Sequence, residues 1–225
     1  YQRREYVDVK AVVVADGEPD ARDADQLVDA DLIVAADGGA RWLDAIGVRP
    51  HLLIGDLDSV GAELVDRLAA DGVAIERHPA DKDASDAELA LERTLASGAD
   101  EVVVLGALGG ERLDHELANL LLLADPTRRV RDLRVVRGGT VVRALHGGER
   151  LGLRGAIGDL VSLLPIGGQA EGVRTAGLRF PLGGENLRLG PSRGLSNVIS
   201  DQPASVSLER GTLLVVETSK PEERF

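Results

Sequence analysis

The sequence contains no cysteine and no methionine, and its aromatic residues are limited to two Phe, two Tyr and one Trp among 225 residues. The absence of cysteine excludes disulfides, thiolate metal sites and a cysteine nucleophile, and it is consistent with a cytoplasmic protein. With so few aromatic residues the core must be mostly aliphatic, and a hydrophobic content of 44% is sufficient to form one.

Positive charge is also scarce. The formal net charge is −12, and of the 26 basic residues three are lysines. Nonspecific nucleic-acid binding draws on clustered Lys and Arg, so we expect no nucleic-acid partner. No apolar run approaches the roughly 20 residues that span a bilayer, so we expect no membrane partner either.

The first 125 residues alternate short aliphatic runs with helical patterns. The runs are typical of strands buried on both faces, and they lie at 10–16, 31–37, 51–56, 73–79 and 101–107. Helical stretches are expected at 23–30, 39–46, 61–71, 85–98 and 112–124. At the start of the fourth stretch, Ser85 and Glu88 form the S-x-x-E pattern of a capping box. This alternation predicts a Rossmann-like α/β/α domain with a mostly parallel sheet, in which ligands bind at the carboxyl ends of the strands.

The pattern changes after about residue 127. Residues 133–145 are expected to form a hairpin that turns at Gly138-Gly139, and from 147 onward short β-like runs are separated by Gly and Pro without a helical period. We therefore predict a nucleotide-binding α/β domain at 1–128, a connecting hairpin at 129–146 and a small β-sandwich at 147–225. The closing residues 220–225 are expected to fray.

Acidic motifs follow several of the expected parallel strands. They are "ADGGA" with Asp37, "GDLDS" with Asp56 and Asp58, "DKDASD" with Asp81, Asp83 and Asp86, and "GERLDH" with Asp114. Carboxylates gathered at one edge repel each other and need a compensating cation, and Mg²⁺ with the phosphates of a nucleotide is the natural candidate. The predicted metal ligands are Asp56, Asp58, Asp83 and Asp86.

Each motif also has a purely structural interpretation. Asp37 before Gly38 can cap a turn, Ser85 and Asp86 suit the first turn of a helix, and Asp81 with Lys82 can be solvated loop charges. The motif "GDLDS" is hardest to explain in this way. Its two carboxylates face one crevice if the backbone turns, which Gly55 would allow. Four such motifs at one edge of a sheet argue against coincidence.

Two further segments carry candidate binding residues. If a helix begins near Arg112, the side chains of Arg112, His115 and Asn119 project within one face, and the arginine lies beside backbone N–H groups suited to a phosphate. The glycines of "GALGG" just before it let a phosphate approach the backbone. In the β-rich half, the loop "GPSRGLSN" contains Ser196 and Asn197, which can present a hydroxyl and an amide to a small polar heterocycle or form an ordinary turn.

These motifs, in this order, closely resemble the thiamine pyrophosphokinase family. The resemblance rests on "ADGGA", "GDLDS", "DKDASDAELAL", "GALGGERLDHELANLLLL" and "GLRFPL…LRLGPSRGLSN", and it extends from about residue 10 to 218. It implies transfer of a diphosphate from Mg-ATP to the hydroxyl of thiamine, giving thiamine diphosphate and AMP. It also implies a homodimer, with thiamine bound near the interface between the α/β domain of one chain and the β domain of the other.

The resemblance assigns roles by motif. The implied catalytic residues are Asp56, Asp58, Asp86, Arg112 and Asp114. The implied thiamine- or nucleotide-binding residues are Asp37, Gly38, Ser59, Asp83, Ser85, His115, Asn119, Ser196 and Asn197. Ser85 stands where the family usually has Thr, which keeps the hydroxyl. The β domain lacks the Trp that some members have near thiamine, so the stacking partner of the substrate is open, and so is the identity of the base.

The sequence motifs, taken by themselves, are also compatible with three other functions. A diphosphokinase acting on another alcohol, such as a pterin, would share this chemistry. A haloacid-dehalogenase-like phosphatase would explain "DLDSV" as a nucleophile motif, although that motif normally follows the first strand and here follows the third. A non-catalytic sensor of thiamine diphosphate would have no need of both the acidic set and Arg112.

Overall fold

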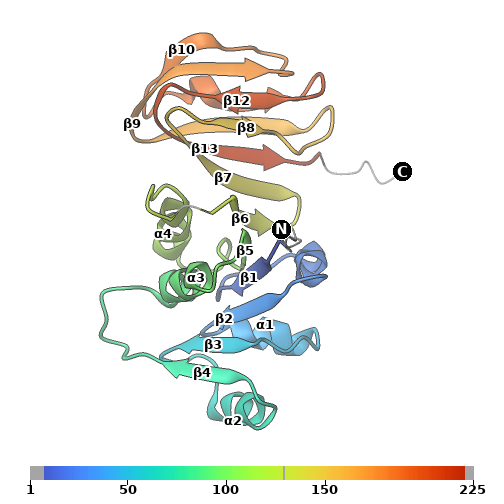
Figure 1. The fold of residues 1–225 in the computed structure, drawn as a ribbon, viewed down its shortest axis with the longest axis vertical. Coiled ribbons are helices and arrows are strands. Elements are labelled where there is room, and N and C mark those ends of the chain that lie inside the picture. Colours follow the sequence, from blue (N-terminus) through green and yellow to red (C-terminus); the bar gives the residue numbers. More distant parts are fainter. Residues whose placement is uncertain (1–7, 129, 221–225) are drawn as a thin grey trace, which may run out of the picture. The chain divides into compact units, whose positions relative to one another are not determined.

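The computed structural model describes residues 8–128 and 130–220 (Figure 1). It contains two compact units: the first comprises the chain up to residue 119 together with 128–138, and the second comprises 120–127 together with the chain from 139 onward. From residue 221, the tail expected to fray lies outside the described residues. Among those that are described, no helix is both long enough and apolar enough for a membrane span.

The first unit contains a six-stranded parallel sheet with strand order β4-β3-β2-β1-β5-β6. The strands are β1 (Lys10–Val14), β2 (Leu32–Ala36), β3 (Leu52–Gly55), β4 (Ala74–Arg77), β5 (Glu101–Leu105) and β6 (Asp132–Arg137). The five predicted strands and their parallel arrangement are confirmed. β2 to β4 lie on one side of β1, whereas β5 and β6 lie on the other. Such a reversal of strand order opens a crevice beyond the carboxyl ends of the strands.

Helices alternate with these strands along the chain. They are the 3-10 helix η1 (Ala21–Leu27) and the α-helices α1 (Gly39–Ala45), α2 (Ala62–Ala70), α3 (Asp86–Ala96) and α4 (Leu113–Leu123). Both α1 and α3 pack against β1 and β2. The last four residues of β1 and of β2 are all buried, which is the burial expected of central parallel strands with both faces covered.

The start of α3 differs in one detail from the expected capping box. The Ser85 hydroxyl accepts a hydrogen bond from the backbone N–H of Glu88 at 3.1 Å, as predicted. The Glu88 carboxylate, however, pairs with the guanidinium of Arg128 at 2.5 Å and does not turn back to the N-cap. The second half of the box is therefore replaced by an ion pair that joins α3 to the segment after α4.

Removing this cap gives a first testable prediction. Ser85→Ala leaves the Glu88 N–H at the start of α3 without its side-chain acceptor, and we expect a loss of about 1 kcal/mol in the free energy of unfolding. Ser85→Thr keeps the hydroxyl and should change that free energy by less than half as much. Urea unfolding followed by circular dichroism measures both variants. An alanine variant as stable as the parent would show that the cap contributes nothing.

The second unit is built from antiparallel strands in the order β7-β13-β9-β12-β8, with β10 and β11 also paired to β9. They are β7 (Thr140–His146), β8 (Arg150–Gly152), β9 (Leu160–Ala176), β10 (Gly183–Leu187), β11 (Asn197–Val198), β12 (Ser205–Ser207) and β13 (Arg210–Thr218). The first half of β9 pairs with β13 and its second half with β12 and β10. A change from parallel to antiparallel pairing along the chain is confirmed, whereas the sandwich description stays a prediction.

Candidate active site

A cleft of about 700 Å³ lies at the carboxyl ends of the parallel strands of the first unit. Its walls come from the segments that follow β1, β2, β3 and β5, from the loop that leads into α3, and from the first two turns of α4. Of the residues predicted for the site, those that line the cleft are Asp37, Asp56, Asp58, Ser59, Asp83, Ser85, Asp86, Arg112, Asp114, His115 and Asn119. The topology therefore gathers motifs that are far apart in the sequence.

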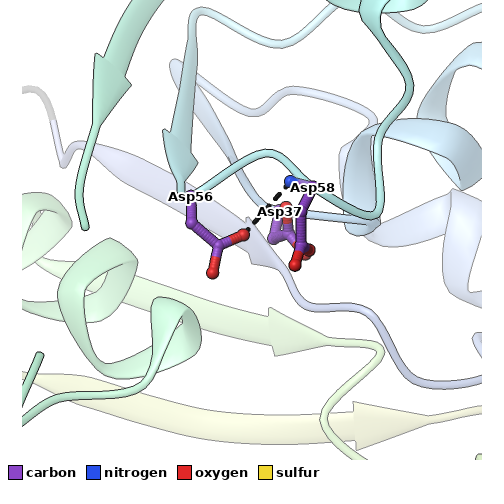
Figure 2. Close-up of side chains that lie close together, drawn as sticks. All are labelled: Asp37, Asp56 and Asp58. Carbon is purple, nitrogen blue, oxygen red and sulfur yellow. Dashed lines mark hydrogen bonds between the residues drawn. The ribbon is translucent and has the colours of Figure 1, made fainter. Parts of the chain in front are cut away.

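The backbone of "GDLDS" turns at two points. Gly55 has φ of +150° and Leu57 has φ of +66°, a left-handed conformation that leucine rarely adopts. The Leu57 side chain is buried, so packing holds this conformation, and such strain is often found at functional sites. As a result the two carboxylates lie close together, and the Asp58 N–H donates to Asp56 Oδ1 at 3.1 Å (Figure 2).

Asp37 completes a group of three carboxylates. One oxygen from each of Asp37, Asp56 and Asp58 lies within 4.8 Å of the others, and Figure 2 shows the three side chains gathered at the ends of their strands. The Ser59 hydroxyl donates to Asp37 Oδ2. Asp37 Oδ1 is buried and has no hydrogen-bond partner among the described residues. An unsatisfied buried oxygen beside two further carboxylates suits a hard cation such as Mg²⁺.

The electrostatics of this group point the same way. Burial raises the pKa of Asp37 above its ordinary value, and the negative charges of Asp86 and Asp56 raise it further. The hydrogen bond from Ser59 acts in the opposite direction but does not cancel this rise. The pKa of Asp58 is also raised, because its carboxylate lies against that of Asp56. A cation bound among these carboxylates would offset their mutual repulsion and stabilise their ionised forms.

The loop before α3 brings an unexpected cation into the cleft. Lys82 Nζ lies 2.9 Å from Asp86 Oδ1 and 3.9 Å from Asp56 Oδ2, and the lysine side chain is 14% exposed. The interpretation of Lys82 as a solvated loop charge is therefore wrong. Asp81 is exposed, as that interpretation expects. Asp83 and Asp86 line the cleft but lie outside the group of three close carboxylates, so their role as metal ligands stays a prediction.

The start of α4 places Arg112 at the rim. The carbonyl of Arg112 accepts the first helical hydrogen bonds, from the N–H groups of His115 and Glu116. The guanidinium donates twice to the Asp114 carboxylate, at 2.9 and 2.6 Å, and this contact lowers the pKa of Asp114 to about 2. Both side chains are exposed. A phosphate that binds Arg112 must therefore compete with Asp114 for the same N–H groups.

Other predicted residues have structural contacts of their own. The Asn119 amide donates to the carbonyl of Ala107 at 3.0 Å, which ties α4 to the turn after β5. Gly38 is not among the residues that line the cleft, and an added Cβ there would lie 2.0 Å from Asp16 Oδ1. The missing side chain of Gly38 thus makes room for Asp16, which pairs with Arg41 at 2.9 Å.

Several residues of the cleft were not predicted from the sequence: Asp16, Gly17, Lys82, Glu111 and Glu116. The signal for Asp16 was present, because it ends the first aliphatic run just as Asp37 ends the second. Gly17 packs so closely that an added Cβ would lie 2.4 Å from the carbonyl oxygen of Gly106. Lys82 had no comparable signal, since nothing in a loop fixes the direction of a lysine.

In the second unit, Asn197 lies at a small pocket whose walls include Phe180, Leu182 and Arg193. The Asn197 amide donates to the carbonyl of Phe180, and its Oδ1 accepts from the N–H of Phe180. These two hydrogen bonds link β11 to the segment between β9 and β10, in addition to any role of Asn197 in binding. Ser196 is exposed, with φ of +56°. The substrate roles of both residues stay predictions.

Comparisons with known proteins give consistent results. Residues 24–136 match the family model for the thiamin pyrophosphokinase catalytic domain, and residues 151–213 match the model for the thiamin pyrophosphokinase vitamin B1 binding domain. Thiamine pyrophosphokinase from Bacillus subtilis is 24% identical over 84% of this chain and 87% of its own, and thiamine pyrophosphokinase 1 from Arabidopsis thaliana is 27% identical over 85% and 79%. The crystal structure of the B. subtilis protein superposes with a TM-score of 0.82 at 22% identity, over 94% of this chain and all of that one.

Proposed function

Because the chain belongs to the thiamine pyrophosphokinase family, we propose that it transfers the diphosphate of Mg-ATP to the hydroxyl of thiamine, forming thiamine diphosphate and AMP. The observation that carries this proposal is the cleft at the carboxyl ends of the parallel strands, where Asp37, Asp56 and Asp58 bring their carboxylates together. A nucleotide with its metal ion is the ligand class that such an acidic strand edge suits.

The donor set fits Mg²⁺. All the close ligands are carboxylate oxygens, which this hard cation prefers, and Asp37 Oδ1 lacks a hydrogen-bond partner among the described residues. We propose Asp56 and Asp58 as the principal ligands, with Asp37, Asp83 or Asp86 completing the site. Mg²⁺ held there would supply positive charge to the phosphate oxygens of ATP.

The residues of the cleft would then position two substrates. Transfer of a diphosphate requires the hydroxyl oxygen of thiamine to attack the β-phosphorus, so that AMP departs as the leaving group. Arg112, at the start of α4, would take up phosphate charge in place of its present partner Asp114. The barrier to such a transfer is mainly positional and electrostatic, so these residues act by orienting the phosphates and offsetting their charge.

The acidic cleft also suits the second substrate. Thiamine carries a thiazolium cation, and the net negative charge of the cleft walls would attract it. If Asp37 or Asp83 completes the metal site, Asp86 is the residue that we propose accepts the hydroxyl proton, since its Oδ1 is buried and lies beside the Lys82 ammonium that also contacts Asp56. Ser196 and Asn197 of the second unit are proposed to contact thiamine.

Further parts of the proposal concern organisation. We propose a catalytic domain at 1–128, a connecting hairpin at 129–146 and a thiamine-binding sandwich at 147–225, assembled as a homodimer in the cytoplasm. The first family model ends at residue 136, within this hairpin, and the second begins at residue 151, after it. Sedimentation of the purified protein across a concentration range tests the dimer directly.

A product assay separates the proposed function from its rivals. The protein is incubated with Mg-ATP and either thiamine, a hydroxymethyl pterin or a phosphate monoester, and AMP, ADP and free phosphate are quantified. AMP that appears with thiamine alone supports the proposal. AMP that appears with the pterin would indicate a pterin diphosphokinase instead. Free phosphate released from the monoester would indicate a phosphatase. Binding of thiamine diphosphate without any turnover would indicate a sensor.

A further inference from the structure

The loop residue Lys82 brings an ammonium group into contact with the acidic cleft. Its Nζ lies 2.9 Å from Asp86 Oδ1 and 3.9 Å from Asp56 Oδ2, and the side chains of these three residues are between 14% and 23% exposed. The contact with Asp86 lacks the geometry of a hydrogen bond, and Asp86 Oδ1 has no hydrogen-bond partner among the described residues. The ammonium is thus held mainly by charge, and such a contact is easily exchanged for another.

The charge balance of the cleft makes this ammonium important. The lysine and arginine residues of the cleft lining are Lys82 and Arg112. The acidic residues of the lining are far more numerous: Asp16, Asp37, Asp56, Asp58, Asp83, Asp86, Glu111, Asp114 and Glu116. Arg112 is engaged at the rim by Asp114. Lys82 is therefore the cation that offsets the repulsion among the inner carboxylates when no metal ion is bound.

A metal ion and this ammonium would compete for the same carboxylate. Asp56 belongs to the group of three close carboxylates and also contacts Lys82. Two cations a few ångströms apart on one carboxylate repel each other. A divalent ion at Asp56 would therefore weaken the hold of Asp56 and Asp86 on Lys82. The lysine stem, with four flexible carbons on a loop without regular structure, allows the ammonium to swing away.

We propose that Lys82 is a tethered counter-cation that exchanges its carboxylate partners for phosphate oxygens when the metal–nucleotide complex enters the cleft. The inference rests on the proposed function, because it requires a polyphosphate in this site. The ammonium neutralises the empty cleft, and it then offsets charge on the phosphates of the bound nucleotide. The same side chain thus stabilises the empty cleft through carboxylate oxygens and the nucleotide-bound cleft through phosphate oxygens.

The exchange predicts opposite effects on two affinities. In Lys82→Gln, Mg²⁺ alone should bind about 3- to 10-fold more tightly, because a competing positive charge has been removed. The KM for Mg-ATP should rise at least about 10-fold, because a charge-assisted contact with phosphate has been lost. Lys82→Arg should keep most of the nucleotide affinity. Lys220→Gln is the matched control, since Lys220 lies in the second unit, outside the cleft, and it should change neither value.

The scarcity of lysine provides a direct readout that does not depend on turnover. Reductive methylation with ¹³C-formaldehyde keeps the charge and labels three lysines, Lys10, Lys82 and Lys220, besides the terminal amine. The Lys82 signal, assigned by its loss in Lys82→Arg, should shift when Mg²⁺ is added and shift again with a non-hydrolysable ATP analogue. The signals of Lys10 and Lys220 should stay in place.

Each outcome decides the inference. A Lys82 signal that moves in neither step, or a Lys82→Gln protein whose affinities for Mg²⁺ and for Mg-ATP fall together, would show that the lysine serves only to hold the loop. Thermal unfolding of each variant identifies a folding defect separately. If the Lys82 signal shifts as expected but the parent protein forms no AMP, the exchange stands and the proposed reaction fails, so the two failures are distinguishable.

Discussion

Asp58→Asn is expected to lower the rate of AMP formation on the order of 10³-fold while leaving the protein folded. Asp58 is exposed, and a hydrogen bond with the Asp56 carboxyl group, together with the negative charge of Asp56, raises the pKa of Asp58. The amide of asparagine has nearly the same shape but no charge, so it removes a metal ligand without creating a cavity. Rates at saturating Mg²⁺ and substrates measure the loss.

The stability of the same variant is an internal control. A raised carboxyl pKa means that the folded protein binds the proton more tightly than the unfolded chain, so ionised Asp58 opposes folding above its ordinary pKa of 3.8. Without metal, Asp58→Asn should therefore be at least as stable as the parent at neutral pH, and the difference should vanish at lower pH, where Asp58 is protonated in both states. The control variant is Asp66→Asn, because Asp66 is an exposed aspartate of α2, and this variant should behave as the parent. Near-normal turnover of Asp58→Asn at saturating Mg²⁺ would contradict the role of Asp58 as a metal ligand.

Gly39→Ala is expected to destabilise the first unit by about 3 kcal/mol and to abolish most activity with it. An added Cβ at Gly39 would lie 2.1 Å from the carbonyl oxygen of Val14 and 2.7 Å from its carbon, both parts of the backbone of β1. No rotamer change relieves such a clash, so α1 must move away from the sheet. Asp37, two residues earlier, would then lose its position beside Asp56.

The chain offers a reporter and a control for this prediction. Trp42, its one tryptophan, lies in α1, so fluorescence during urea unfolding follows the affected unit. Gly152→Ala is the matched control, because an added Cβ there meets nothing within 4 Å, and the expected change is below about 0.5 kcal/mol. Equal midpoints for Gly39→Ala and Gly152→Ala would refute the idea that this close approach positions the site.

The sequence predicts the framework of the site well, for a simple physical reason. Aliphatic runs such as Lys10–Val14 and Leu32–Ala36 are recognisable because central parallel strands are buried on both faces. Once those strands are placed, their carboxyl ends must meet at one edge. The proximity of Asp37 to Asp56 then follows from topology alone.

Other features depend on contacts that no local pattern reveals. Leucine normally avoids a left-handed backbone, so the conformation of Leu57 arises from the packing of its buried side chain. Glu88 leaves its expected capping role because Arg128, 40 residues further on, binds its carboxylate. Lys82 points inward because the assembled carboxylates attract it, and those carboxylates come together only in the folded chain. Packing and ion pairs that form only in the folded chain thus determine what the sequence pattern leaves open.

The path of the β-phosphorus of ATP distinguishes transfer of a diphosphate from transfer of a single phosphoryl group. The protein is given Mg-ATP labelled at the β-position together with thiamine, and the products are separated. The label is expected in thiamine diphosphate, with one unlabelled AMP formed for each molecule of product. Label retained in ADP, with thiamine monophosphate as the other product, would show transfer of a single phosphoryl group and would rule out diphosphate transfer.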